Sequence, residues 1–329
     1  MSLIKVEGLK THFYKGKGIL SKLFGKGLRT IHAVDGISFS IKGSETFGLV
    51  GESGCGKSTV GNSIVRLVEP IEGEIFFEGT DILQADESEM REFRRNAQLI
   101  FQDPRSCLNP RMTAGEIIAE PLRVAGTRDA KKESQGQIVA ELLDAVNLSP
   151  EDAYKYPHEF SGGQARRIGV ARAIALNPKF IIADEPTSGL DVSTAATILN
   201  LMQDIQEKYN LTYLWISHNL HVVKHVCDKM AVMYLGKIVE MGKTEDVFKT
   251  ILHPYTRALF SVIPRIDFKS ERKKIILKGE VPSPINPPAG CRFRPRCERA
   301  LPKCTSEEPE LIDAGGGHFA ACHLLFDHC

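Results

Sequence analysis

The feature that most constrains this chain is a glycine-rich loop at residues 51–59, which reads Gly-Glu-Ser-Gly-Cys-Gly-Lys-Ser-Thr. The loop fits the pattern G-x-x-x-x-G-K-[ST] and follows an apolar run at residues 46–50, so a strand, the loop and a helix start succeed one another. In such a loop the backbone N–H groups converge on phosphate oxygens, and the helix dipole adds to the attraction. The sequence therefore predicts a binding site for a nucleoside triphosphate.

The side chains of this loop have separate expected tasks. We expect Lys57 to reach the β and γ phosphates and Ser58 to give its hydroxyl to Mg²⁺. Thr59 caps the same turn. The other residues expected to surround the phosphates are Gly51, Ser53, Gly54, Cys55 and Gly56.

Composition excludes some classes of function. Lys plus Arg number 42 and Asp plus Glu number 41, so the overall charge gives no case for nucleic acid or an anionic membrane as a general partner. No run of about 18 uncharged apolar residues exists, and the first residues lack the apolar core of a signal peptide. We expect a cytosolic chain without a membrane span of its own.

The order of apolar segments predicts an α/β fold. Two half-buried antiparallel strands are expected at 4–7 and 37–41, because apolar and polar residues alternate there. Continuous apolar runs are typical of parallel strands that are covered on both faces. The further predicted elements are strands at 73–79, 99–101, 180–183 and 213–216, a helix at about 193–208, a hairpin at 230–241 and a helical insertion that includes 130–148.

Two features near the start of the chain allow alternative interpretations. The segment from Lys15 to Arg29 carries basic residues and no acid, which fits either a solvated hairpin extension or a contact with phospholipid headgroups or a partner. Phe13 precedes this insertion. Its ring is expected either to stack on a nucleobase or to lie in the core, and Tyr14 is the alternative stacking residue.

The acidic pair Asp184-Glu185 follows the predicted strand at 180–183. Asp184 is expected to hold Mg²⁺, often through water, as the second acidic motif of nucleotide hydrolases does. Glu185, one residue further along, is expected to orient the attacking water and to act as a general base.

A second glycine-containing segment, Ser161-Gly162-Gly163-Gln164, opens another predicted helix whose N-terminus attracts anions. Together with the phosphate loop, Gln102, the acidic pair and His218, this order of motifs is highly specific. On these motifs, residues 3–250 resemble the ATP-binding-cassette (ABC) ATPases. The resemblance implies a nucleotide-binding domain at 1–250 with a RecA-like parallel-sheet core, an antiparallel β subdomain and a helical subdomain at about 103–172.

The same resemblance gives roles to residues outside the phosphate loop. Gln102 would sense the γ-phosphate, share in holding Mg²⁺ and touch a membrane partner. Asp191 would lie in the loop that crosses the dimer seam, and His218 would steady the γ-phosphate. Residues of one subunit would also close over the nucleotide held by the other; these are Ser161, Gly163 and Gln164.

Five of the eight cysteines fall in the last 39 residues. In a reducing compartment such clustering indicates a metal site rather than disulfides. Four of them are spaced C-x5-C-x6-C-x17-C, more widely than the usual zinc pairs or common ferredoxin-type runs. Spacing alone leaves the metal open. The proposed ligands are Cys291, Cys297, Cys304 and Cys322, with Cys329, His318, His323 and His328 as alternatives for the fourth.

Basic side chains alternate with these cysteines. They either offset the negative charge of a metal cluster or are simply solvated on the surface; they are Arg292, Arg294, Arg296, Arg299 and Lys303. With residues 253–259 and 279–288, the tail resembles the C-terminal extension of oligopeptide and dipeptide importer ATPases. Members of that group hold a 4Fe-4S cluster there. The resemblance implies a small cysteine-rich domain at 251–329 with such a cluster, and Zn²⁺ is the alternative. The basic insertion and residues 108–113 favour the F-type partner of the two ATPases in such importers.

The resemblance implies ATP hydrolysis that powers import of short peptides, by a peripheral subunit at the cytoplasmic face of the cell membrane. The implied partners are a second ABC ATPase subunit, identical or different, two transmembrane permease subunits and an extracytoplasmic peptide-binding protein, but no nucleic acid. The alternatives are an importer of another small solute such as nickel complexes, a soluble cassette mechanoenzyme acting on nucleic acid or ribosomes, and a metal-sensing or electron-transfer protein.

Overall fold

The computed structural model describes residues 2–15, 29–126, 132–261 and 275–325. The chain folds into two compact units, each built from separate stretches of sequence. The first comprises Met1–Ile4, Ile41–Thr46 and Phe77–Ile216, and the second comprises Lys5–Ser40, Phe47–Phe76 and Ser217–Cys329. None of the helices in the described ranges combines the length and apolar character that a membrane span requires.

Three parallel strands form the centre of the first unit. Strand β7 (Phe180–Asp184) lies between β6 (Ala97–Ile100) and β8 (Thr212–Ser217), with Ile100 opposite Ala183 and Ile182 opposite Leu214. The residues of β8 and the first four of β7 are buried. The predicted parallel strands are therefore confirmed, and their unbroken apolar runs reflect cover on both faces.

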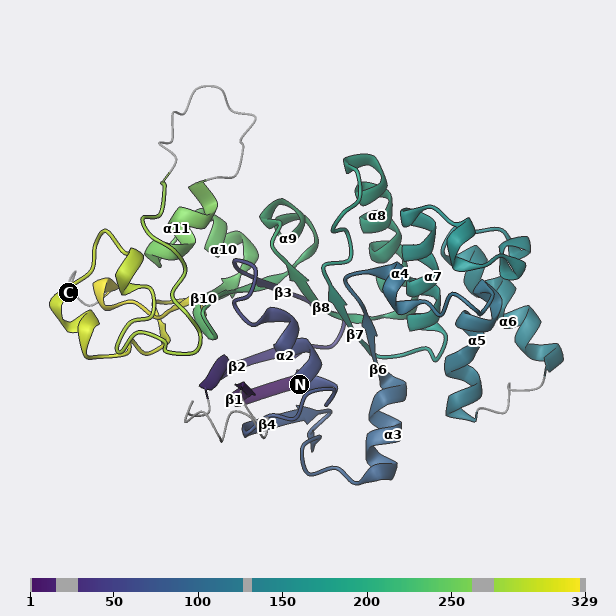
Figure 1. The fold of residues 1–329 in the computed structure, drawn as a ribbon, viewed down its shortest axis with the longest axis horizontal. Coiled ribbons are helices and arrows are strands. Elements are labelled where there is room, and N and C mark those ends of the chain that lie inside the picture. Colours follow the sequence, from purple (N-terminus) through teal and green to yellow (C-terminus); the bar gives the residue numbers. More distant parts are fainter. Residues whose placement is uncertain (1, 16–28, 127–131, 262–274, 326–329) are drawn as a thin grey trace, which may run out of the picture. The chain divides into compact units, whose positions relative to one another are not determined.

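Helices make up most of the remaining first unit, and α5, α6 and α7 pack against one another (Figure 1). Thr113 caps α5 and exchanges hydrogen bonds with Glu116, which fixes the start of this helix after a run of turns. The elements are β5 (Thr80–Asp81), α3 (Glu87–Asn96), α4 (Pro104–Cys107), α5 (Ala114–Ala125), α6 (Lys132–Ala145), η2 (Pro150–Tyr154), η3 (Pro157–Glu159), α7 (Gly162–Ile174) and α8 (Val192–Tyr209).

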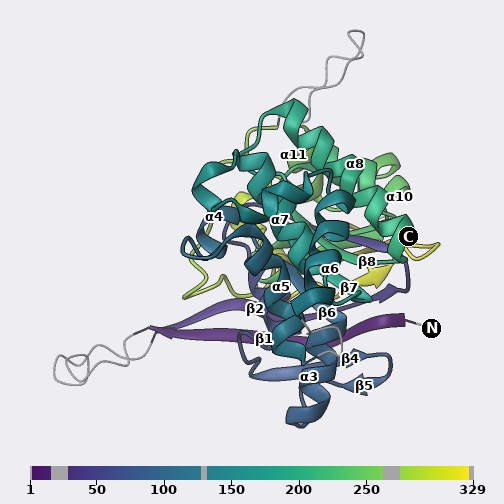
Figure 2. The same cartoon turned by 90° about the vertical axis from the view of Figure 1, so that its right-hand side faces the viewer.

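The second unit contains most of β1 (Ser2–Lys15) and β2 (Arg29–Lys42), two neighbouring strands of 14 residues each (Figure 2). They are much longer than the predicted strands at 4–7 and 37–41, so the alternating pattern marks only part of each. Strand β4 (Glu72–Phe77) lies on the other side of β1. Most of the basic insertion, residues 16–28, lies outside the described residues.

A further sheet in this unit carries the phosphate loop. Strand β3 (Thr46–Val50) runs parallel to β9 (Lys229–Tyr234), which forms an antiparallel hairpin with β10 (Lys237–Lys243). The predicted hairpin at 230–241 is thus confirmed. Helices of this unit are α2 (Lys57–Ile64), α9 (Leu220–Val226), α10 (Thr244–Lys249) and α11 (Pro254–Ser261).

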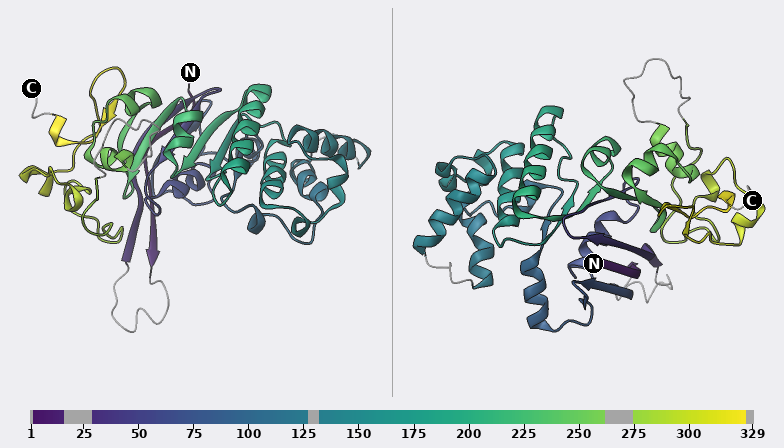
Figure 3. Two further views of the ribbon diagram at one scale, coloured as in Figure 1. Left: turned by 90° about the horizontal axis from the view of Figure 1, so that it is seen from above. Right: turned by 180° about the vertical axis from the view of Figure 1, so that it is seen from behind.

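The cysteine-rich tail extends the same sheet, which the sequence did not predict. Strand β12 (Phe319–Ala320) pairs antiparallel with β10, and β11 (Ile312–Asp313) pairs with β12. The tail, yellow in Figure 3, lies beside the green segments that precede it in the chain. The other regular elements of the described tail are η4 (Arg294–Arg296), η5 (Pro302–Thr305) and η6 (His323–Leu325). Cys329 and His328 lie outside the described residues.

A buried carboxylate holds the tail and α11 against β10. Glu240 on β10 is fully buried and accepts hydrogen bonds from the backbone N–H groups of Leu252 and His253, each at 2.9 Å. Its Oε1 also lies 2.9 Å from Nε2 of His318 in the tail. Burial lowers the pKa of His253 to about 4, so this imidazole is neutral at pH 7 and its Nδ1 accepts the N–H of Tyr255.

Candidate nucleotide site

The phosphate loop connects β3 to α2 and has a backbone path that needs glycine. Gly51 and Gly56 have φ angles of 156° and 110°. A Cβ on Gly51 would lie 2.2 Å from the carbonyl oxygen of Met233, and one on Gly56 would lie 2.1 Å from that of Ala33. No side chain caps the start of α2, so its first N–H groups can donate to a bound anion.

Lys57 lies folded back over this loop. Its side chain is buried, and Nζ donates to the carbonyl oxygens of Gly51 and Glu52 at 2.9 and 3.0 Å. The ammonium charge is therefore held above the converging backbone, where the β and γ phosphates are bound in loops of this type. Cys55 is buried behind the loop and burial raises the pKa of its thiol, which fits a packing role.

In the first unit, the structure brings Gln102 and Glu185 together. Nε2 of Gln102 donates to Oε2 of Glu185 at 3.0 Å. Glu185 has a φ of 47°, an unfavourable value for a residue other than glycine, and its N–H bonds the carbonyl of Ile216 at 2.9 Å. Asp184, the last residue of β7, lies opposite Ile216 in the pairing with β8. Backbone strain of this kind is typical of functional positions.

Arg166 is a site residue that sequence reasoning did not single out. It lies on α7, is 2 % exposed, and its guanidinium donates to the carbonyls of Gln102 at 2.7 Å and Ser188 at 3.0 Å. One buried side chain thus positions both the loop that carries Gln102 and the loop after Glu185. Its place early on the helix after the glycine quartet was the available signal.

The quartet at 161–164 forms the start of α7 as predicted. Ser161 accepts the N–H of Gln164 at 3.3 Å, and Oε1 of Gln164 accepts the N–H of Ser161 at 3.0 Å. A Cβ on Gly163 would lie 2.6 Å from Cγ2 of Thr194, so this glycine permits close packing with α8. The side chain of Asp191 caps α8, and hydrogen bonds from Ser193 and Thr194 hold the pKa of Asp191 well below its usual range.

Most of the remaining predicted residues are on exposed positions. In the second unit, Phe13 on β1 is 39 % exposed and Tyr14 is 48 % exposed, so the expectation of a core role for Phe13 is wrong. His218 follows β8 and is exposed. Ser58 is exposed at the start of α2, and Thr59 is half-buried beside it.

The chain matches two family models. The model described as ABC transporter covers residues 34–188, and the model described as oligopeptide/dipeptide transporter, C-terminal region, covers residues 239–304. A putative oligopeptide transport ATP-binding protein of Bacillus subtilis, YkfD, is 48% identical over 98% of this chain and 96% of its own length. The chain belongs to the ABC transporter family. It is an ATPase subunit of that family, with an ABC nucleotide-binding fold of mixed sheet and helices.

Other similar proteins agree with this assignment. The oligopeptide transport ATP-binding protein AppF of Bacillus subtilis is 48% identical over 98% of this ABC protein and 97% of its own length. A solved dimeric ATP-binding cassette in a post-hydrolysis state, bound to ADP and phosphate, is 28% identical with a TM-score of 0.64. That likeness covers 73% of this chain and 98% of the solved one, and the nucleotide-binding fold prediction is confirmed to this extent.

The four tail cysteines proposed as ligands have free thiols. The N–H of Cys291 bonds the carbonyl of Cys304 at 3.0 Å, which joins two of them through the backbone. Burial raises the pKa of Cys322 to about 11, and the charges of Cys291, Cys297 and Cys304 add to this shift. No three of their sulfurs, all within the described ranges, lie mutually within 4.8 Å.

Proposed function

We propose that this chain is a nucleotide-binding subunit of an ABC importer of dipeptides or oligopeptides, of the F type. The hydrogen bond between Gln102 and Glu185 carries the catalytic part of this proposal, because it joins the proposed γ-phosphate sensor to the proposed general base. Similarity to peptide transport and peptide import proteins along nearly the whole chain, including its C-terminal region, supports the cargo class.

In the proposed reaction, Lys57 and the loop backbone bind the ATP phosphates. Ser58, Gln102 and Asp184 would hold Mg²⁺, which offsets phosphate charge when bound. Glu185 accepts a proton from the water that attacks the γ-phosphate. His218 steadies the γ-phosphate, and Phe13 or Tyr14, both exposed, stacks on adenine.

The site is proposed to be completed by a second ATPase subunit, identical or different. The glycine quartet at 161–164 and the loop at Asp191 would face the nucleotide of that partner. ATP closes the two cassettes and hydrolysis reopens them, which drives two membrane-spanning permease subunits at the cytoplasmic face of the membrane. An extracytoplasmic protein would deliver the peptide. In this scheme residues 1–250 are the cassette, 103–172 its helical part, and 251–329 the C-terminal extension.

Purification of the tagged chain from its host tests this function. We expect the chain to bring down polytopic membrane proteins together with a second cassette ATPase, because the proposed role needs both. The readout is mass spectrometry of the co-purified proteins, with an untagged strain as the control. Recovery of RNA or ribosomal proteins in their place would contradict the importer and favour the mechanoenzyme alternative.

We also propose that the four tail cysteines hold a metal centre larger than a single ion. Four thiolates around one zinc ion at 2.3 Å would lie about 3.8 Å apart, whereas no three of these sulfurs are mutually within 4.8 Å. His318 and His323 each use Nε2 in a hydrogen bond, to Glu240 and to the carbonyl of Glu307. We keep Cys322 as the proposed fourth ligand, because it completes a set of four thiolates. A 4Fe-4S cluster held by Cys291, Cys297, Cys304 and Cys322 would supply a covalent crosslink to this irregular segment.

Metal analysis tests this assignment. Protein purified without oxygen is expected to contain about four iron atoms per chain and to absorb visible light, as Cys₄-bound clusters do. Cys304→Ser, which removes one proposed ligand, should lower the iron content at least several-fold, while Cys107→Ser, remote in sequence from the tail, should leave it unchanged. Stoichiometric zinc without iron would exclude the cluster.

A further inference from the structure

The phosphate loop contains an acidic residue, Glu52, that residues far along the chain hold from two sides. Nη1 of Arg296 lies 2.9 Å from Oε2 and 3.3 Å from Oε1 of Glu52. The hydroxyl of Tyr255 accepts the backbone N–H of the same Glu52 at 3.0 Å. Both partners belong to the second unit, as the loop does, and both lie more than 200 residues beyond it.

These two partners are themselves fixed by packing. Tyr255 is fully buried, and its ring contacts those of Tyr234 and Phe293, with centroids 4.6 and 5.5 Å away. The side chain of Arg296 is 9 % exposed and ends the short helix η4, directly before Cys297. Because Tyr255 is fully buried and the side chain of Arg296 is largely buried, Glu52 is held by a packed surface of the cysteine-rich tail and α11.

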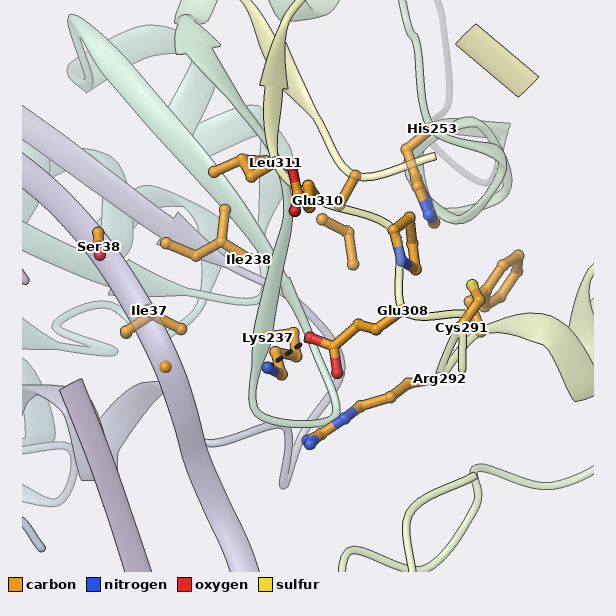
Figure 4. A pocket seen from close by; sticks show the side chains of 15 residues that line it. Ile37, Ser38, Lys237, Ile238, His253, Cys291, Arg292, Glu308, Glu310 and Leu311 are labelled. Carbon is orange, nitrogen blue, oxygen red and sulfur yellow. Dashed lines mark ion pairs between the residues drawn. The ribbon is translucent and has the colours of Figure 1, made fainter. Parts of the chain in front are cut away.

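The tail is anchored to the same unit at a second point. The guanidinium of Arg292 donates to the carboxylate of Asp35 on β2 and, at 2.6 Å, to the carbonyl of Leu235 in the turn after β9. Cys291 and Arg292 line a pocket of about 400 Å³ beside β10, in which Lys237 pairs with Glu308 (Figure 4). No residue of the phosphate loop lines this pocket. The segment from Cys291 to Cys297 thus has a fixed position on the sheet that carries the loop.

The contact with Arg296 has an electrostatic consequence. A carboxylate at the second position of a loop that binds a triphosphate repels its ligand, and partial burial reduces the screening of that repulsion. The side chain of Glu52 is only 27 % exposed. The paired guanidinium offsets this charge and also keeps the carboxylate turned toward the tail.

We propose that Arg296 is a positioning residue of the nucleotide site: with Tyr255 it holds Glu52, offsets its charge and makes the affinity for ATP depend on the folded cysteine-rich tail. The inference rests on the nucleotide site proposed above at Lys57. It gives the tail a role in nucleotide binding that needs neither electron transfer nor contact with the membrane subunits.

Calorimetric titration of the full chain with MgATP tests the proposal. Arg296→Gln, which keeps the bulk and removes the charge, should raise Kd roughly tenfold, a factor typical of one lost charge-assisted contact. The kcat at saturating ATP should change less than about threefold, because the contact acts on binding. Arg296→Lys should retain most of the affinity, since it keeps the charge.

Removal of the acid supplies the decisive comparison. In Arg296→Gln/Glu52→Gln, no unpaired charge remains, so Kd should return to within about threefold of the original value. Arg294→Ala is the matched control, because Arg294 bonds the carbonyl of Thr305 within the tail and has no bond to Glu52. It should leave Kd unchanged.

Three results would overturn the proposal: an unchanged Kd for Arg296→Gln, an absent rescue by Glu52→Gln, or an equal loss of affinity in Arg294→Ala. Glu52→Gln alone leaves the tail sequence intact and should bind MgATP at least as tightly as the original chain. It therefore keeps the charge argument testable if Arg296→Gln is unfolded in a thermal melt. Lys57→Ala separates the two proposals, because unchanged affinity in that variant would refute the nucleotide site itself.

Discussion

Replacing Glu185 by glutamine is expected to lower the kcat of ATP hydrolysis roughly 10²- to 10⁴-fold, the contribution typical of a general base. The amide cannot accept the proton of the attacking water. Its oxygen can still accept the hydrogen bond that Gln102 donates at 3.0 Å, so the loop geometry should persist. The Kd for MgATP should consequently stay within about threefold of the original value, because Lys57 and the loop backbone remain unchanged.

Phosphate release and calorimetry measure the two quantities separately. Since the site needs a partner, hydrolysis is measured in the assembled complex that co-purifies with the chain. The matched control is Glu120→Gln, an exposed acid on α5, which should leave both quantities unchanged. A hydrolysis rate unaffected by Glu185→Gln would contradict the assignment of the base and would favour a regulatory cassette.

The parts of this site that can be predicted from the sequence are those formed by residues close together in the chain. Gly51, Gly56 and Lys57 belong to one local pattern, and their φ angles and contacts follow from the strand, loop and helix order. Asp184 and Glu185 follow an unbroken apolar run, which indicates a strand end at a sheet edge. Ser161 and Gln164 form a capping box readable from their spacing of three.

The parts that sequence did not predict depend on contacts between distant residues. Arg166 meets the carbonyl of Gln102 from 64 positions away. Its place after the glycine quartet marks it as a candidate, but the local pattern does not identify this partner. Arg296 meets Glu52 across 244 positions, and Arg292, Arg294 and Arg299 nearby in the sequence carry the same charge. β12 pairs with β10 over only two residues, which is too short to produce a recognisable alternation of apolar and polar residues in the sequence. Tertiary packing decides each of these cases.

Loss of the Glu240 carboxylate is expected to have the largest effect on stability. Glu240→Ala should lower the free energy of unfolding by about 3 to 5 kcal/mol, because it leaves buried donors without an acceptor. The backbone N–H groups of Leu252 and His253 and the ring of His318 all lose their partner. Urea denaturation followed by circular dichroism measures this change, and Glu245→Ala, an exposed acid on α10, is the control.

Glu240→Gln distinguishes the hydrogen bonds from packing volume. The amide oxygen can still accept from the N–H of Leu252 and from His318, as Oε1 of Glu240 does, but the NH₂ group in place of Oε2 cannot accept the N–H of His253. We therefore expect roughly half of the loss seen with alanine. An unfolding free energy unchanged in both variants would show that other groups satisfy these donors, and that α11 and β12 are held to β10 by apolar contacts. In that case Tyr255 and Arg296 would keep their positions against the phosphate loop without the buried carboxylate.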